Sequence, residues 1–147
     1  MEPNEVEILL VEDSEADIEM TLHSLSEFNV CNAIQVARDG REALDMLFGG
    51  SDGAEGIRPR VVFLDLKLPK VSGHEVLRRM KSDEKTREIP VVVMTSSGEQ
   101  ADIDRCYALG ANSYVVKPIG FEDFSRVIKQ LKLYWLMVNR PPSQKDH

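Results

Sequence analysis

Cysteine is scarce in this sequence. Only Cys31 and Cys106 occur among 147 residues, far apart and without the spacing of a metal-binding motif. A disulfide or a zinc site is therefore not expected, and we interpret both residues as small hydrophobic side chains of the core.

An excess of positive charge and long apolar runs are also missing. The formal net charge is −7, which disfavours binding to nucleic acid or to an anionic membrane, because both need clustered Lys and Arg. No run approaches the roughly 18 apolar residues of a membrane span. The N-terminus is acidic before its first apolar run, unlike a secretory signal. We expect a cytoplasmic protein whose partners are other proteins.

The sequence does contain enough apolar residues, 42%, for the core of one domain. Its apolar segments are of two kinds. Short continuous runs rich in Val and Ile predict buried parallel strands at 6–11, 61–64 and 89–94, with weaker candidates at 33–37 and 113–116.

Segments with helical spacing lie between these runs. Ser14 and Asp17 form a capping-box pattern that predicts the start of the first helix. The later helices are expected at 41–48, 74–82, 100–110 and 121–138. A strand followed by a helix, five times over, predicts a doubly wound α/β fold with a parallel sheet and helices on both faces.

Polar residues follow the predicted strands. Glu12 and Asp13 come after the first, Asp65 after the third, Thr95 at the end of the fourth and Lys117 after the fifth. The ligand crevice of such a sheet lies beyond the carboxyl ends of its strands. We therefore expect these side chains to converge there.

Three close carboxylates repel one another, and a hard divalent cation relieves that repulsion. Mg²⁺ suits oxygen ligands and keeps several waters, so two or three carboxylates and a carbonyl suffice. Lys117 adds a positive charge for a bound anion. Together these groups predict phosphoryl transfer to a carboxylate.

Four segments, "LLVEDS", "VVFLDLKLPKVSG", "VVVMTSS" and "YVVKPI", occur in this order and spacing. The combination resembles the receiver domain of two-component response regulators. The resemblance implies a flavodoxin-like sheet with strand order 2-1-3-4-5. It also implies a receiver over residues 5–138 with an extended C-terminal helix, a flexible tail over 139–147 and no output domain.

The resemblance also assigns roles. Asp65 matches the residue that accepts a phosphoryl group from a sensor histidine kinase. Glu12, Asp13 and Asp65 match the Mg²⁺ ligands, completed by the backbone carbonyl of Lys67. Glu12 departs from the aspartate that is common at its position.

The remaining matches concern switching. Thr95 matches the hydroxyl that moves toward the phosphoryl group, Lys117 the lysine that pairs with it, and Tyr114 the aromatic residue that rotates as the hydroxyl moves. The bond between Lys117 and Pro118 matches one that is cis in the family. Lys67 and Ser97 flank the path of attacking water and are expected to set the dephosphorylation rate, in a direction that the sequence leaves open.

The end of the last predicted helix reads "LYWLMV", apolar almost all round. Such a patch, if exposed, marks an interface, so Tyr134, Trp135 and Leu136 are candidates for a homodimer contact or a docking surface. The alternative is that these residues fold back over their own domain. The "YWL" ending and the loop at 49–60 are most similar to single-domain regulators of cyanobacterial and bacterial phytochromes, which suggests a phytochrome as the kinase.

The three histidines, His23, His74 and His147, lack ligand spacing and are interpreted as surface residues. We expect a signalling protein rather than an enzyme. Two alternatives stay open: a magnesium-dependent phosphatase or phosphotransferase that uses an aspartyl-phosphate, and a receiver-like scaffold that is not phosphorylated. Lys67 disfavours the first, since haloacid dehalogenase-type phosphatases carry an aspartate there. The intact Asp65, Thr95 and Lys117 disfavour the second.

Overall fold

A computed structural model describes residues 6–26, 33–50 and 55–143. Its sheet has five parallel strands in the order β2-β1-β3-β4-β5, which confirms the predicted topology. The strands are β1 (Ile8–Val11), β2 (Ile34–Ala37), β3 (Val61–Leu64), β4 (Val91–Thr95) and β5 (Ser113–Val116).

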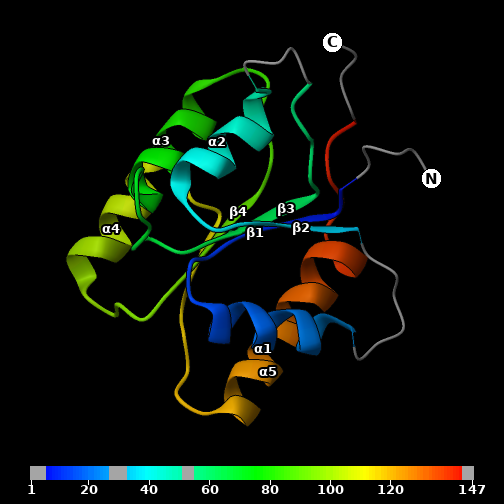
Figure 1. Ribbon diagram of the computed structural model, residues 1–147, viewed down its shortest axis with the longest axis vertical. Helices are drawn as coiled ribbons and strands as arrows, with labels where there is room; N and C mark the ends of the chain where they lie inside the picture. The colour runs from blue at the N-terminus through cyan, green and yellow to red at the C-terminus, as the bar shows by residue number, and fades with distance from the viewer. Residues whose placement is uncertain (1–5, 27–32, 51–54, 144–147) are drawn as a thin grey trace.

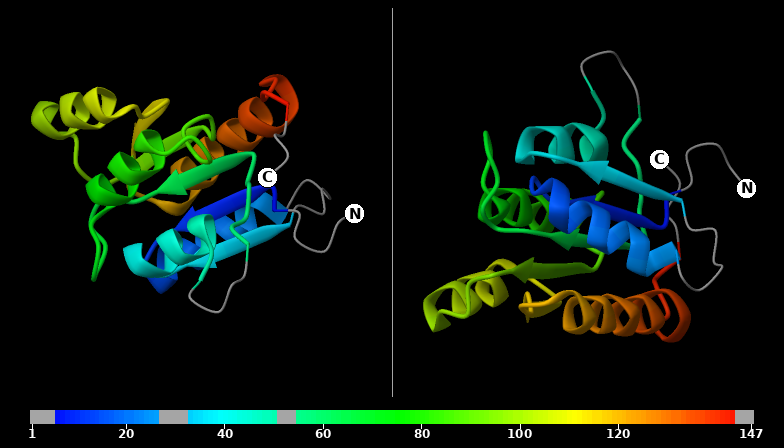
Figure 2. Two further views of the ribbon diagram at one scale, coloured as in Figure 1. Left: turned by 90° about the horizontal axis from the view of Figure 1, so that it is seen from above. Right: turned by 60° about the horizontal axis from the view of Figure 1, so that its bottom comes forward.

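Helices cover both faces of the sheet (Figures 1 and 2). One face carries α2 (Gly40–Phe48), α3 (Gly73–Ser82) and α4 (Gln100–Leu109), and the other carries α1 (Glu15–Ser26) and α5 (Phe121–Lys132). Each face has its own apolar core. Every residue of β1, β3 and β4 is buried, whereas β2 and β5 at the edges are only partly buried. This difference explains why the edge strands gave the weaker sequence signal.

Side chains and glycines fix the helix ends. The N-caps Asp39 and Ser72 accept hydrogen bonds from the backbone N–H groups of the third residues of α2 and α3. Gly110 ends α4 in the left-handed conformation, at a φ of 108°. The start of α1 agrees with the helix start predicted from Ser14 and Asp17, because Ser14 Oγ accepts the N–H of Asp17 at 3.3 Å.

The last helix differs from the prediction of one α-helix over 121–138. α5 ends at Lys132, and the chain continues as a π-helical segment, η1 (Leu133–Val138). Because a π-helix has a longer turn than an α-helix, it directs side chains differently. Trp135 and Leu136 are only 9% and 7% exposed and pack into the core shared with α1 and α5. Their assignment to an exposed interface is therefore wrong, while Tyr134, at 49% exposed, remains on the surface.

The bond between Lys117 and Pro118 is trans, since the described residues contain no cis peptide bond. The expectation of a cis bond is wrong for this structure. The two isomers before proline differ by only about 0.5 to 1 kcal/mol, so the local sequence does not decide between them.

Several predictions concern residues outside the described ranges or close to their ends. Residue 5 and residues 144–147 lie outside the described part of the chain, as does Cys31. Residues 139–143 have no regular secondary structure, and the flexibility of the tail stays a prediction. Cys106 is buried, as expected. Within the described ranges, no helix has the length and apolar character needed to cross a membrane.

Candidate functional site

Strand register brings the acidic residues together. Val11 of β1 pairs with Leu64 of β3, so Glu12 and Asp65 follow them side by side at the carboxyl edge of the sheet. Glu12 and Asp65 are 4% and 8% exposed, and Asp13 faces solvent. One carboxylate oxygen from each of the three residues lies within 4.8 Å of the other two. The structure thus forms the acidic cluster that the sequence predicted.

Lys117 contacts two members of this cluster, Glu12 and Asp65, and also Asp17. Its Nζ donates to Glu12 Oε1 at 2.6 Å, to Asp17 Oδ2 at 2.8 Å and to Asp65 Oδ2 at 3.1 Å. The backbone N–H of Lys117 also donates to the Thr95 carbonyl at 2.7 Å, which fixes the lysine to the end of β4. One ammonium group therefore links carboxylates from three segments of the chain.

Sequence reasoning missed Asp17 as a member of the site. The capping-box pattern assigned it a role at the helix start, yet its carboxylate binds Lys117 rather than the helix end. A signal was available, because side chains in the first turn of a helix point back toward its N-terminus. Since α1 starts just after Glu12 and Asp13, that direction leads to the carboxyl edge.

The titratable groups of the cluster shift one another's pKa values. Burial raises the pKa of Glu12 to about 7; the hydrogen bond from Lys117 opposes the rise and the charge of Asp65 adds to it. Burial alone would lower the pKa of Lys117, but its hydrogen bonds to Asp17 and Glu12 and the charge of Asp65 raise it overall. Lys117 is thus held in its charged form, ready to neutralise an anion.

Backbone contacts hold Asp65 in place. Its Oδ1 accepts the N–H of Leu66 at 2.7 Å, and the Leu66 carbonyl accepts the N–H of Gly73 at 2.9 Å. The N–H of Lys67 lies 3.5 Å from the same Oδ1. The Lys67 side chain is exposed, and the role of its carbonyl as a metal ligand stays a prediction.

Ser97 connects the two predicted switch residues. Thr95 is buried, and its Oγ1 lies 3.5 Å from the N–H of Ser97. The Tyr114 hydroxyl donates to the Ser97 carbonyl at 2.8 Å. The sequence therefore named residues that the structure links, although their switching roles stay predictions.

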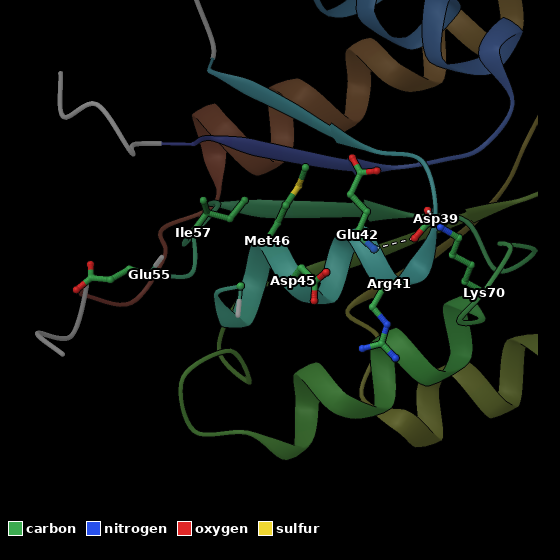
Figure 3. Close-up of a pocket in the computed structure, with 9 residues that line it drawn as sticks. Asp39, Arg41, Glu42, Asp45, Met46, Glu55, Ile57 and Lys70 are labelled. Carbon is green, nitrogen blue, oxygen red and sulfur yellow. Dashed lines mark hydrogen bonds and ion pairs between the residues drawn. The ribbon is translucent and has the colours of Figure 1, made fainter. Parts of the chain in front are cut away.

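A cavity of about 430 Å³ lies elsewhere, beside α2 (Figure 3). Carboxylates supply much of its polar lining, and Arg41 and Lys70 add positive charge. Asp65, Glu12 and Lys117 are not part of the lining. We therefore do not connect this cavity with the chemistry at the carboxyl edge.

The acidic cluster suits a divalent cation, because its donors are carboxylate oxygens of the kind that hard cations prefer. A cation and Lys117 would together offset the charges of Asp65 and of an incoming phosphate. Phosphoryl transfer depends mainly on such positioning and charge neutralisation.

Residues 8–129 match the family model described as the response regulator receiver domain. The chain belongs to the response regulator receiver family. This receiver is therefore a response regulator of two-component signalling, a class whose receivers are phosphorylated by histidine kinases.

Three relatives illustrate the match. The "Probable methanogenesis regulatory protein FilR2" of Methanothrix harundinacea is 44% identical over 92% of this receiver and 86% of FilR2. Rcp1 of Synechocystis is 34% identical over 88% of each chain. Its Mn²⁺-bound crystal structure has a TM-score of 0.87 over 92% of this receiver and 98% of Rcp1. The phosphorylated cyanobacterial phytochrome response regulator RcpA, 36% identical, has a TM-score of 0.89 over 95% and 99% of the two chains.

The contacts of Lys117 predict the effect of its removal. In Lys117→Met, Glu12, Asp17 and Asp65 lose their shared cation and repel one another. Breaking buried ion pairs costs about 3 to 5 kcal/mol, and partial water access reduces this to about 2 kcal/mol of unfolding free energy here. Urea unfolding in a chelator should show the loss, and Mg²⁺ should restore part of it.

Lys85→Met is the matched control, because Lys85 is exposed and distant in sequence from the cluster. It should change the unfolding free energy by less than about 0.5 kcal/mol. Equal losses in the two variants would contradict a stabilising role for the ion pairs of Lys117.

Proposed function

We propose that this receiver takes a phosphoryl group onto Asp65 from a phosphohistidine of a sensor kinase. The observation that carries the proposal is the fixed position of the Asp65 carboxylate between the Leu66 N–H and Lys117 Nζ. A carboxylate oxygen of Asp65 attacks phosphorus, the P–N bond to the kinase histidine breaks, and the imidazole leaves with the bond's electron pair and takes up a proton. Lys117 neutralises the anion that forms on Asp65.

Mg²⁺ is the proposed cofactor. Glu12, Asp13 and Asp65 would hold it through carboxylate oxygens, with the Lys67 carbonyl as a further ligand. When bound, it supplies positive charge opposite the phosphoryl oxygens. The acidic cluster of this chain and the Mn²⁺ in the Rcp1 structure support a divalent site.

Phosphorylation then acts through Thr95 and Tyr114. The Thr95 hydroxyl is proposed to move to the phosphoryl group, and Tyr114 to change orientation because Ser97 links it to Thr95. Output is by protein contact in the cytoplasm, and the only chemistry is phosphorylation and dephosphorylation of the receiver itself.

A phytochrome is the proposed kinase. RcpA supports this, since it is a cyanobacterial phytochrome response regulator. The name of FilR2 indicates a different pathway. Phosphotransfer from a purified phytochrome kinase, compared in red and far-red light, would decide between these two pathways. Transfer at just one of the two wavelengths would support the light pathway. Absence of transfer at both wavelengths would contradict it.

The proposed function is tested with Mg²⁺ and acetyl phosphate as a small phosphoryl donor. Mass spectrometry should show a gain of about 80 Da, the mass of one phosphoryl group on a carboxylate. Rapid hydrolysis of assorted phosphate esters would instead support a phosphatase. Absence of labelling with this donor and with a phosphorylated kinase would leave the scaffold as the answer.

A homodimer through η1 is also proposed. Four apolar side chains of η1 are exposed, namely Leu133, Tyr134, Met137 and Val138. The double variant Tyr134→Ser/Met137→Ser should weaken the dimer at least tenfold, since Tyr is a frequent interface hot spot and Met is enriched at interfaces. Light scattering over a dilution series, with and without phosphorylation, measures this.

Tyr107→Ser is the control for that variant, because Tyr107 on α4 is 49% exposed, the same fraction as Tyr134. It should leave the dimer unchanged. A wild-type receiver that stays monomeric throughout the dilution series would contradict the dimer.

A further inference from the structure

Ser97 is anchored to α4 as well as to the switch residues. Its hydroxyl donates to Asp102 Oδ2 at 2.6 Å, and the N–H of Glu99 donates back to that hydroxyl at 3.3 Å. The N–H of Ser97 faces Thr95 and its carbonyl accepts from Tyr114. Asp102 therefore holds Ser97, a residue that contacts both Thr95 and Tyr114.

His74 of α3 faces the same carboxylate from the other side. Its Nε2 lies 3.9 Å from Asp102 Oδ1, and its side chain is only 15% exposed, contrary to the surface position that the sequence suggested. Within the described residues, this buried Nε2 has no hydrogen-bond partner. Such groups are rare in folded proteins and call for an explanation.

The charges around His74 favour its neutral form. Burial and the positive charge of Arg105 lower the pKa of His74, while Asp102 raises it by a smaller amount. A neutral imidazole carries one N–H, which can be on Nε2. Asp102 thus has one donor engaged, Ser97, and a second donor within about 1 Å of hydrogen-bond distance.

We propose that the Asp102 carboxylate exchanges partners during switching, bonded to Ser97 before phosphorylation and to His74 after it. This inference rests on the proposed movement of Thr95 toward the phosphoryl group. Asp102 and His74 are positioning residues, since neither contacts Asp65 through any described hydrogen bond.

The exchange follows from the geometry around Ser97. Ser97 is two residues from Thr95 and contacts its hydroxyl, so movement of Thr95 pulls on Ser97. The bond from Ser97 to Asp102 opposes this movement and favours the unphosphorylated state. Once it breaks, a partly buried carboxylate without a donor would be costly. A bond from His74 Nε2–H offsets that cost and also satisfies His74.

The two bonds therefore act in opposite directions on the switch. Ser97→Ala removes the bond that favours the unphosphorylated state, and His74→Phe removes the bond that favours the phosphorylated state. A role in packing alone would not produce effects of opposite sign. This difference in sign provides the test.

The test uses beryllofluoride with Mg²⁺ as a phosphoryl analogue, titrated into the full chain by calorimetry. Ser97→Ala should bind the analogue about tenfold more tightly than wild type, and His74→Phe about fivefold more weakly, which is within the net range of one typical hydrogen bond. The double variant should return close to wild type. In nitrogen NMR of the wild type, the His74 Nε2 signal should shift toward a hydrogen-bonded value when the analogue binds.

Two further variants guard against misfolding and nonspecific charge effects. His74→Gln keeps an N–H donor and should bind the analogue within about twofold of wild type. Asp104→Asn should do the same, because Asp104 lies on the same helix and, among the residues that the structure describes, accepts just an exposed hydrogen bond from Gln100.

The outcomes distinguish the partner exchange of Asp102 from the proposed phosphorylation function. If wild type binds the analogue but Ser97→Ala and His74→Phe shift the affinity in the same direction, or not at all, the exchange is overturned and the proposed function stands. If wild type fails to bind the analogue with Mg²⁺, the proposed function falls and the exchange falls with it.

Discussion

Asp65→Asn abolishes the expected gain of about 80 Da from acetyl phosphate and Mg²⁺. The amide of Asn is a very poor nucleophile toward phosphorus, and it would also weaken the cation site by removing one of three carboxylates. The side chain keeps its shape, so the Asn oxygen can still accept the Leu66 N–H that now bonds Asp65 at 2.7 Å. Loss of labelling would therefore report lost chemistry rather than lost structure.

Two further variants test whether the loss of labelling is specific to Asp65. Asp13→Asn removes a proposed cation ligand but no nucleophile, so labelling should slow and be partly recovered at higher Mg²⁺. Asp104→Asn, on the exposed face of α4, should be labelled like wild type. Full labelling of Asp65→Asn, with the phosphate mapped to another residue, would contradict the assignment of Asp65.

Gly73→Ala should destabilise the receiver by about 3 kcal/mol, although alanine normally stabilises a helix by about 1 kcal/mol relative to glycine. A Cβ at Gly73 would lie 2.2 Å from the Asp65 carbonyl oxygen and 2.6 Å from the Leu66 Cα. Both are backbone atoms, so the clash cannot be relieved by a side-chain rotation. The start of α3 or the end of β3 has to move.

That movement also reaches the chemistry. A shift of about 1 Å at a reacting group can cost about 100-fold in rate, so labelling of Gly73→Ala by acetyl phosphate should slow by a similar factor. Urea unfolding and timed mass spectrometry measure the two effects. Gly40→Ala should have similar effects. Its Cβ would lie 1.9 Å from the carbonyl oxygen of Val71, which is in the loop between β3 and α3.

Gly98→Ala is the control for the glycine variants. The nearest atom to a Cβ at Gly98 is Val116 Cγ2 at 3.8 Å, which is an ordinary contact. Stability and labelling should both stay close to wild type. If Gly73→Ala were as stable as Gly98→Ala, the close packing of α3 against the end of β3 would not hold in solution.

The fold was predictable because its signals are local. Runs such as 61–64 are apolar throughout since β3 is covered on both faces, and helix starts are marked by caps such as Ser72. The alternation of strands and helices then limits the topology. The strand order itself came from the family resemblance, because no local pattern specifies which strands are neighbours.

The candidate site was predictable to the extent that strand ends define it. Glu12 and Asp65 follow buried strands, Lys117 follows the partly buried edge strand β5, and a parallel sheet brings these strand ends to one edge. Asp17 and His74 were missed because their positions depend on how a helix packs against its neighbours. The direction of the first helical turn points Asp17 toward the carboxyl edge, but the sequence does not identify the residue that either side chain contacts.

The wrong expectations have the same origin. The exposure of Trp135 and Leu136 depends on whether the final turns are α-helical or π-helical, and the sequence pattern alone does not distinguish the two. The isomer before Pro118 depends on a small energy difference that the surrounding structure decides.

The chain after η1 has a practical consequence for experiments. Pro141 and Pro142 lie beside Pro59 and Pro90, which precede β3 and β4, so this segment is at the amino edge of the sheet. The acidic cluster is at the carboxyl edge, about 13 Å away along a four-residue strand. A biotin or affinity tag attached beyond residue 143 would thus tether the receiver to a biosensor surface with Asp65 facing the solution. Kinase binding and metal titration can then be measured on immobilised protein without blocking the site.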